Sequence, residues 1–139
     1  MPDDEKTTPD NVELLKAKAK EEPIAAFFKM KLVELKPGYA KITMTLAPEH
    51  LNFNGMVFGG IIMAIADQAF AYASNSMVMP SIATQFNIHL IAGANVGDEL
   101  TAEGRIIKSG RRIGVTEMTV TNQTCKLIAK ATGTTVVTE

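Results

Sequence analysis

The sequence has little of the residue types that form disulfides and metal sites, with one cysteine and two histidines among 139 residues. A single cysteine, Cys125, excludes an intrachain disulfide and a zinc site made of several cysteines. His50 and His89 lie far apart in the chain and do not have the spacing of metal ligands. We therefore expect neither a disulfide framework nor a bound metal.

The chain also lacks an excess of either charge and a long hydrophobic run. Its 14 basic and 15 acidic residues give a net charge of −1 at pH 7, which predicts no nucleic-acid or membrane partner. The most apolar stretch, residues 58–74, contains Asp67 and Gln68 and is too short to cross a bilayer. The first ten residues are polar and acidic, unlike a signal peptide, so we expect a cytoplasmic protein.

The length and the 46% of hydrophobic residues are typical of one globular domain. We expect a disordered lead-in at residues 1–9, a modest helix at 11–21 and a short helical turn opened by Pro23. These residues, 1–23, precede the domain proper, which we place at 24–139.

Two patterns predict the core of that domain. "AKITMTL" (residues 40–46) alternates apolar and polar residues, so 30–36 and 39–46 are expected to form a hairpin around a Pro-Gly turn. The stretch from Gly59 to about Ser74 is alanine-rich and predicts a helix that neighbouring elements cover nearly all round. Four further strands are expected at residues 81–91, 98–108, 112–121 and 126–137. Short turns between them predict antiparallel pairing, and the whole predicts an α+β fold with one long buried helix against a curved sheet.

Two groups of a possible reaction centre lie on this helix. A helix that begins at Gly59 or Gly60 directs free N–H groups outward, where they can stabilise a carbonyl oxygen that gains negative charge. The alternative is that the two glycines only allow close packing. Asp67 has apolar helical neighbours, which raise a carboxyl pKa toward the range of a general base. The alternative there is a structural hydrogen bond or ion pair.

The spacing of these groups makes a second chain necessary. Asp67 follows Gly59 by eight residues, about 12 Å along one helix. A base or nucleophile and an oxyanion donor must both reach one carbonyl group, within about 3–4 Å. If both act on one substrate, Asp67 must meet the Gly59 end of a partner helix, and an antiparallel pair about a two-fold axis gives two equivalent sites.

"HLNFNGMVFGGIIMAIADQAFAYASNS" (residues 50–76) resembles the signature of hot-dog-fold acyl-CoA thioesterases of the phenylacetate-degradation, PaaI-like type. That signature is an Asn, then His-Gly-Gly, then an Asp eight residues after the first Gly of the pair. The resemblance covers roughly residues 24–137. It implies hydrolysis of acyl-CoA thioesters, no cofactor beyond the CoA of the substrate, and a homodimer, which we expect to pair into a tetramer.

By position, Asp67 resembles the catalytic carboxylate, which acts as a general base on water or as a nucleophile. Gly59 resembles the residue whose N–H polarises the thioester carbonyl, and Asn52 the residue that orients the thioester or the water. The resemblance and the residue types extend the expected substrate contacts to Gly60, Phe58, Met63, Thr84, Lys108, Arg111 and Arg112. For the three basic residues of the "KSGRR" turn, a solvated hairpin tip is an equal alternative.

One position departs from the pattern, because Phe58 stands where the family usually has His. The change makes the expected pocket floor more apolar and leaves room for a protein that binds acyl-CoA without efficient turnover. A thioester hydratase or dehydratase is a further alternative, but that chemistry requires an Asp/His pair, and this helix contains no His. The identity of the acyl chain, aromatic or aliphatic, stays open.

Overall fold

The computed structural model describes the backbone of residues 2–138 and the side chains of residues 11–138. The elements run in the order α1 (Pro2–Ala19), α2 (Pro23–Phe28), β1 (Lys31–Lys36), β2 (Tyr39–Thr45), the short 3-10 helix η1 (Pro48–His50), α3 (Gly59–Met77), β3 (Ser81–Leu90), β4 (Glu99–Ser109), β5 (Ile113–Thr121) and β6 (Leu127–Val137). The predicted hairpin, long helix and four later strands are therefore confirmed.

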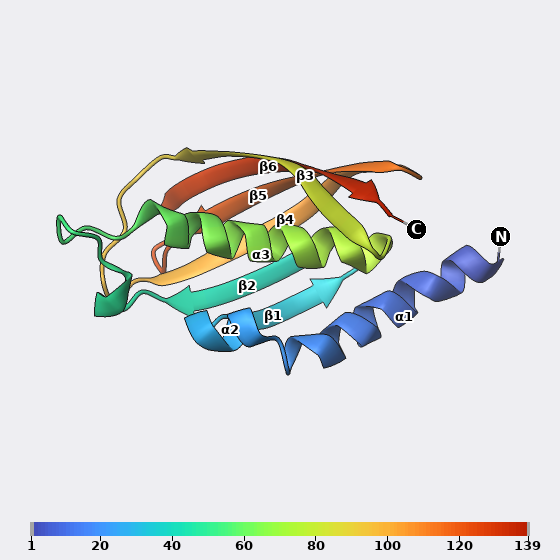
Figure 1. Cartoon of the computed structure of the whole chain (residues 1–139), viewed down its shortest axis with the longest axis horizontal. Coiled ribbons are helices and arrows are strands. Elements are labelled where there is room, and N and C mark those ends of the chain that lie inside the picture. The colour runs from blue at the N-terminus through green and yellow to red at the C-terminus, as the bar shows by residue number, and fades with distance from the viewer. Residues whose placement is uncertain (1, 139) are drawn as a thin grey trace.

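All six strands form one antiparallel sheet in the order β1-β2-β4-β5-β6-β3. Helix α3 lies across one face of this sheet, and α1 and α2 lie beside the β1 edge (Figure 1). Strand β3 follows α3 in the sequence but pairs with β6. Helix α3 therefore connects β2, near one edge of the sheet, with β3 at the opposite edge. The result is the expected α+β arrangement.

The core lies between α3 and the sheet. The helix contributes apolar side chains that are at most 4% exposed: Ile61, Ile62, Ile65, Ala66, Ala69, Phe70 and Ala73. The sheet contributes equally buried side chains from its central strands: Ile42, Met44, Leu100, Ala102, Met118, Val120 and Ile128. Full burial of one large apolar side chain contributes about 1.5–3 kcal/mol, so this layer holds α3 in place.

In the single chain, helix α3 is not covered all round, because one row of residues stays exposed. Met63 is 41% exposed, and Asp67 and Ala71 are exposed as well. Residues four positions apart lie one above another on a helix. Met63, Asp67 and Ala71 therefore form an exposed stripe, which the sheet does not reach because it covers only the opposite side of α3.

The expectation of a disordered lead-in was also wrong for residues 2–9, because α1 already begins at Pro2. Met1 lies outside the described residues. Proline is tolerated in the first turn of a helix, and the acidic residues 3–5 have a composition that favours a helix N-terminus. Further along α1, Val12 and Leu15 are buried at 7% and 8% exposure, and both belong to the main core.

Close contact between α3 and the sheet depends on a glycine in β4. A Cβ atom added to Gly104 would lie 2.7 Å from the carbonyl oxygen of Ala69 and 3.3 Å from the Cβ of Ala73. The first contact involves helix backbone, which cannot move aside without shifting α3 as a whole.

Gly104→Ala should therefore destabilise the fold by about 1–3 kcal/mol, the usual effect of overpacking a well-packed core. The measurement is the free energy of unfolding in urea. Gly93→Ala is the matched control, because a Cβ atom at Gly93 meets nothing within 4 Å. An equal loss of stability in both variants would contradict the proposed contact.

Candidate active site

The N-terminal end of α3 presents backbone donors without protein partners. Phe58 is the N-cap residue, with extended backbone (φ −63°, ψ 125°) and no side-chain cap. The first N–H groups of a helix have no intrahelical acceptor. Ile61 N–H bonds the carbonyl of Phe58 at 3.0 Å, but no protein acceptor for Gly59 N–H or Gly60 N–H is found within residues 2–138. Two donors are thus available to a ligand.

Side chains lie close to both glycines. A Cβ atom at Gly60 would lie 2.2 Å from the Phe58 ring, and one at Gly59 would lie 3.1 Å from Cδ1 of Leu90. Both contacts are to exposed side chains, Phe58 at 58% and Leu90 at 53%, so the packing explanation for these glycines stays open beside a role as donors. A larger residue at position 60 would displace the Phe58 ring that covers the helix end.

Asn52 organises the loop before α3. Its Oδ1 accepts hydrogen bonds from Asn54 N–H at 2.9 Å and Met56 N–H at 3.2 Å, and its own N–H donates to Met56 O at 2.7 Å. Two backbone donors fix the orientation of the amide. The side-chain oxygen is thus used within the loop, and the NH₂ group is the part of Asn52 that remains available to orient a substrate or water.

An open cavity of about 430 Å³ lies beside this helix end. Its walls are formed by Phe28, Glu49, His50, Leu51, Asn52, Phe58, Gly60 and Ile61. Small-molecule sites commonly have volumes of about 300–1,000 Å³, with largely apolar walls and a few polar groups. The cavity combines apolar side chains from α2, α3 and the loop with the donors of Gly60 and Asn52, which suits an apolar group attached to a polar carbonyl.

Asp67 lies in the exposed stripe of α3, two turns after the helix end. Neighbouring atoms desolvate its carboxyl group and raise its pKa above the ordinary value of 3.8, although the residue is exposed in the single chain. No hydrogen bond or ion pair contributes to this shift within the described side chains. The structural alternative for Asp67, a locked hydrogen bond or ion pair, is therefore wrong for the single chain.

Gln68, the next residue, has a different environment. It is 8% exposed, and its Nε2 donates to Oε1 of Glu22 at 2.6 Å. Tyr72 O–H donates to the same oxygen at 2.7 Å, and burial followed by this hydrogen bond raises the pKa of Tyr72. Sequence reasoning missed this cluster, because nothing in the spacing of residues links Glu22 to a helix some forty residues later.

The structure does not bring the other predicted site residues together with Asp67 in one chain. Thr84 lies on the edge strand β3 at an irregularity in its pairing with β6, and its hydroxyl donates to Thr134 O at 3.4 Å. Lys108, Arg111 and Arg112 are exposed on the β4–β5 hairpin, beside the C-terminal half of α3 and far from Gly59 (Figure 1).

Side chains 11–138 contain no group of three His, Cys, Asp or Glu residues placed to hold a metal ion. None of the helices within residues 2–138 is long and apolar enough to pass through a bilayer.

Asp67→Asn removes a carboxylate that the fold desolvates and that no hydrogen bond or ion pair among the described side chains stabilises. Because the folded-state pKa is raised, ionisation opposes folding: the cost is absent below the ordinary pKa of 3.8 and present above the folded-state pKa. The variant should therefore gain melting temperature relative to the unmodified protein, and the gain should be larger at pH 7 than at pH 4.

Asp98→Asn is the control of opposite sign. Hydrogen bonds from Gln123 Nε2 and Asn95 N–H, both 2.9 Å, lower the pKa of Asp98. Its carboxylate favours folding above the ordinary pKa, so this variant should lose melting temperature at pH 7. If the melting temperature fell in both variants, the Asp67 carboxylate would have a stabilising partner, which would contradict the prediction.

Known proteins resemble this chain over most of its length. The Thioesterase superfamily model matches residues 54–129. A putative esterase of Archaeoglobus fulgidus is 40% identical over 104 residues, 75% of this chain and 68% of that protein. Acyl-coenzyme A thioesterase PaaI of Escherichia coli is 33% identical over 98 residues, 70% of each chain.

Solved structures give the same result for the fold. The E. coli PaaI protein from the phenylacetic acid degradation operon superposes with a TM-score of 0.89 and 26% identity, covering 95% of this chain and 96% of that one. A Streptococcus mutans protein bound to acetyl CoA superposes with a TM-score of 0.75 and 32% identity, covering 78% of this chain and 88% of that one. The sequence match and the architecture lead to one conclusion: this chain belongs to the thioesterase superfamily and has the hot-dog fold of its PaaI-like members.

Proposed function

We propose that this protein hydrolyses acyl-CoA thioesters to a free carboxylic acid and CoA. The observation that carries the proposal is the pair of unpartnered groups on α3, the N–H donors at Gly59 and Gly60 and the desolvated carboxyl of Asp67. The names of the relatives support the substrate class, since PaaI is an acyl-coenzyme A thioesterase and the S. mutans protein was solved with acetyl CoA.

The chemistry requires one carboxylate, which acts as a base or a nucleophile, and one site that stabilises an oxyanion. The Asp67 carboxylate either takes a proton from the attacking water or attacks the thioester carbon itself. In both cases the carbonyl oxygen gains negative charge, which N–H donors at a helix N-terminus stabilise. On the base route, the tetrahedral intermediate expels CoA, whose sulfur takes up the proton that Asp67 removed from water. On the nucleophile route, loss of CoA leaves a mixed anhydride on Asp67, and water then hydrolyses it, which releases the acid, restores the carboxylate and supplies the proton for the CoA thiolate. This sequence uses no metal and no bound cofactor.

The site is proposed to be shared between two subunits, because α3 is one continuous helix and its two active groups are about 12 Å apart along the axis. In an antiparallel pair that joins Asp67 of one subunit to the Gly59 end of the other, the two-fold axis passes near Met63, midway between these positions. Met63 belongs to the exposed stripe. The row that the single chain leaves uncovered is thus the row that the pairing would cover.

Two further surfaces support this assembly. The edge strand β3 leaves Ile82 and Leu90 about half exposed, at 50% and 53%, and an unpaired edge is a template for another chain. An antiparallel arrangement also moves the partner's β4–β5 hairpin toward the Gly59 end, since this hairpin lies beside the C-terminal half of α3. Lys108, Arg111 and Arg112 would then serve CoA phosphates at the partner's site.

The cavity beside Gly60 is proposed to receive the acyl group, with Phe58 and Ile61 as apolar walls and Met63 toward the two-fold axis. Its volume suits an aromatic or a medium aliphatic chain equally. Thr84 is proposed to help hold the attacking water. The pairing of dimers into a tetramer and a cytoplasmic location stay predictions.

The direct test is release of free thiol from a panel of aryl- and alkyl-CoA substrates. We expect turnover that falls by about 100-fold or more in Asp67→Ala, the range of general acid–base catalysis, with the mass of the assembly unchanged. Glu49→Ala is the control, because Glu49 lines the same cavity but has no role in the proposed reaction. Tight binding without thiol release in the unmodified protein would instead support an acyl-CoA sensor.

The shared site has its own test, in which two inactive variants are mixed. Asp67→Asn and Asn52→Ala are each expected to be inactive alone. After denaturation and joint refolding, half of the dimers are mixed, and each mixed dimer has one site with an intact Asp67 and an intact Asn52 on opposite chains. Activity should return to about a quarter of that of the unmodified protein. If both residues act within one chain, the mixture stays inactive.

A further inference from the structure

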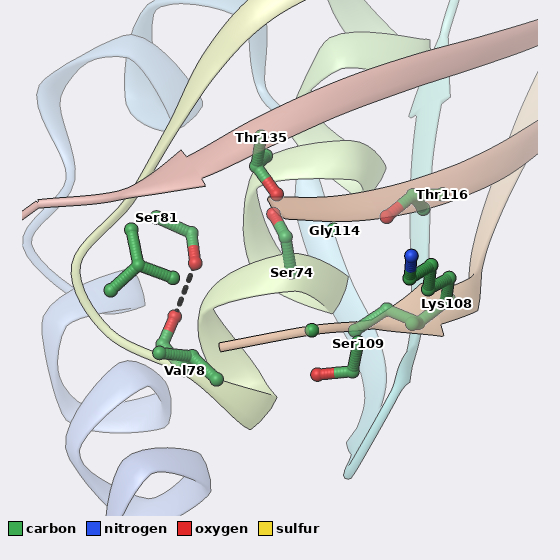
Figure 2. A pocket seen from close by; sticks show the side chains of 11 residues that line it. Ser74, Val78, Ser81, Lys108, Ser109, Gly114, Thr116 and Thr135 are labelled. Atoms are coloured by element: carbon green, nitrogen blue, oxygen red, sulfur yellow. Dashed lines mark hydrogen bonds between the residues drawn. The ribbon is translucent and has the colours of Figure 1, made fainter. Parts of the chain in front are cut away.

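A second, much smaller cavity lies beneath the β4–β5 hairpin, at the end of the molecule that carries the C-terminal half of α3. Its volume is about 10 Å³, and its walls include Ser74 from α3, Thr116 from β5 and Thr135 from β6. Figure 2 shows these three side chains around one space, with the oxygens of Ser74 and Thr135 directed toward each other. Lys108 also lines this cavity, but the proposed reaction uses none of the three hydroxyls.

Thr116 makes this cavity unusual. The residue is 1% exposed, and its Oγ1 has no hydrogen-bond partner among side chains and backbone of the described residues. In Figure 2 this oxygen is directed toward the cavity. A buried hydroxyl without a partner is destabilising, and native proteins retain such groups mainly where water satisfies them.

The neighbouring hydroxyls have spare hydrogen-bonding capacity. Ser74, at 4% exposure, donates its hydrogen to Phe70 O at 2.6 Å, so its oxygen can still accept. Thr135 is also 4% exposed. Gly114 keeps the space open, because a Cβ atom there would lie 2.9 Å from Thr135 Oγ1.

We propose that this cavity is a binding site for one structural water molecule. A space of about 10 Å³ for the centre of a water-sized sphere corresponds to a single water, and such a water requires two to four polar partners. The three hydroxyls supply them: the water donates to Ser74 Oγ and exchanges hydrogen bonds with Thr116 and Thr135. It links α3 to β5 and β6 at the base of the hairpin that carries Arg111 and Arg112.

The change in melting temperature that one substitution causes has opposite signs for a water-filled cavity and an empty one. Thr116→Val keeps the shape of the side chain and removes the hydroxyl. If water fills the cavity, the variant loses a bonded partner, and its melting temperature should fall by about 2–4 °C at fixed protein concentration. If the cavity is dry, the variant removes an unsatisfied group, and the melting temperature should rise, which would overturn the proposal.

Thr119→Val is the matched control, because Thr119 lies on the same strand but on its other, partly exposed face, and no shift is expected there. A high-resolution crystal structure of the full-length protein supplies an independent readout. One peak of water density within hydrogen-bond distance of Thr116 Oγ1 would support the site. An empty cavity in the density of the crystal would contradict it.

Discussion

The proposed reaction depends on the rigidity of one helix. α3 is held against the sheet by a continuous apolar layer and by Gly104, which allows its backbone to approach β4. A helix fixed in this way cannot bend to bring its own Asp67 to its own first N–H groups. The separation of about 12 Å is therefore a constant of the fold, and any reaction that uses both groups requires two helices. The exposed stripe has the position that such a second helix would occupy.

The strands and α3 could be predicted because each has a strong periodic signal. Alternation in residues 40–46 and alanine content in α3 reflect local geometry, which the tertiary structure did not override. The exposed stripe could not be predicted in the same way. An all-apolar helix shows that every side is kept from water, but not whether the sheet of the same chain or a second copy covers that side. The start of α1 could not be predicted for a different reason, because the acidic start of the chain is compatible with both coil and helix.

The adjacent residues Asp67 and Gln68 show the limit of reasoning from residue type. Both stand in an apolar run, but their side chains leave α3 about 100° apart, so Asp67 is exposed and Gln68 is buried. Gln68 is buried and bonded to Glu22, which also accepts from Tyr72. This cluster ties the start of α2 to the middle of the long helix, so the segment expected to precede the domain, residues 1–23, helps to position the helix that carries Asp67. The domain boundary at residue 24 stays a prediction.

Phe58 changes the surroundings of the site rather than its proposed donors. A His at this position would add a polar side chain beside the carbonyl, whereas the Phe ring lies over Gly60 and lines the 430 Å³ cavity. The N–H groups that would hold the oxyanion belong to the backbone, so they are present whichever side chain stands at position 58. The substitution is thus expected to select among acyl groups, while the polarisation of the thioester remains a property of the helix end.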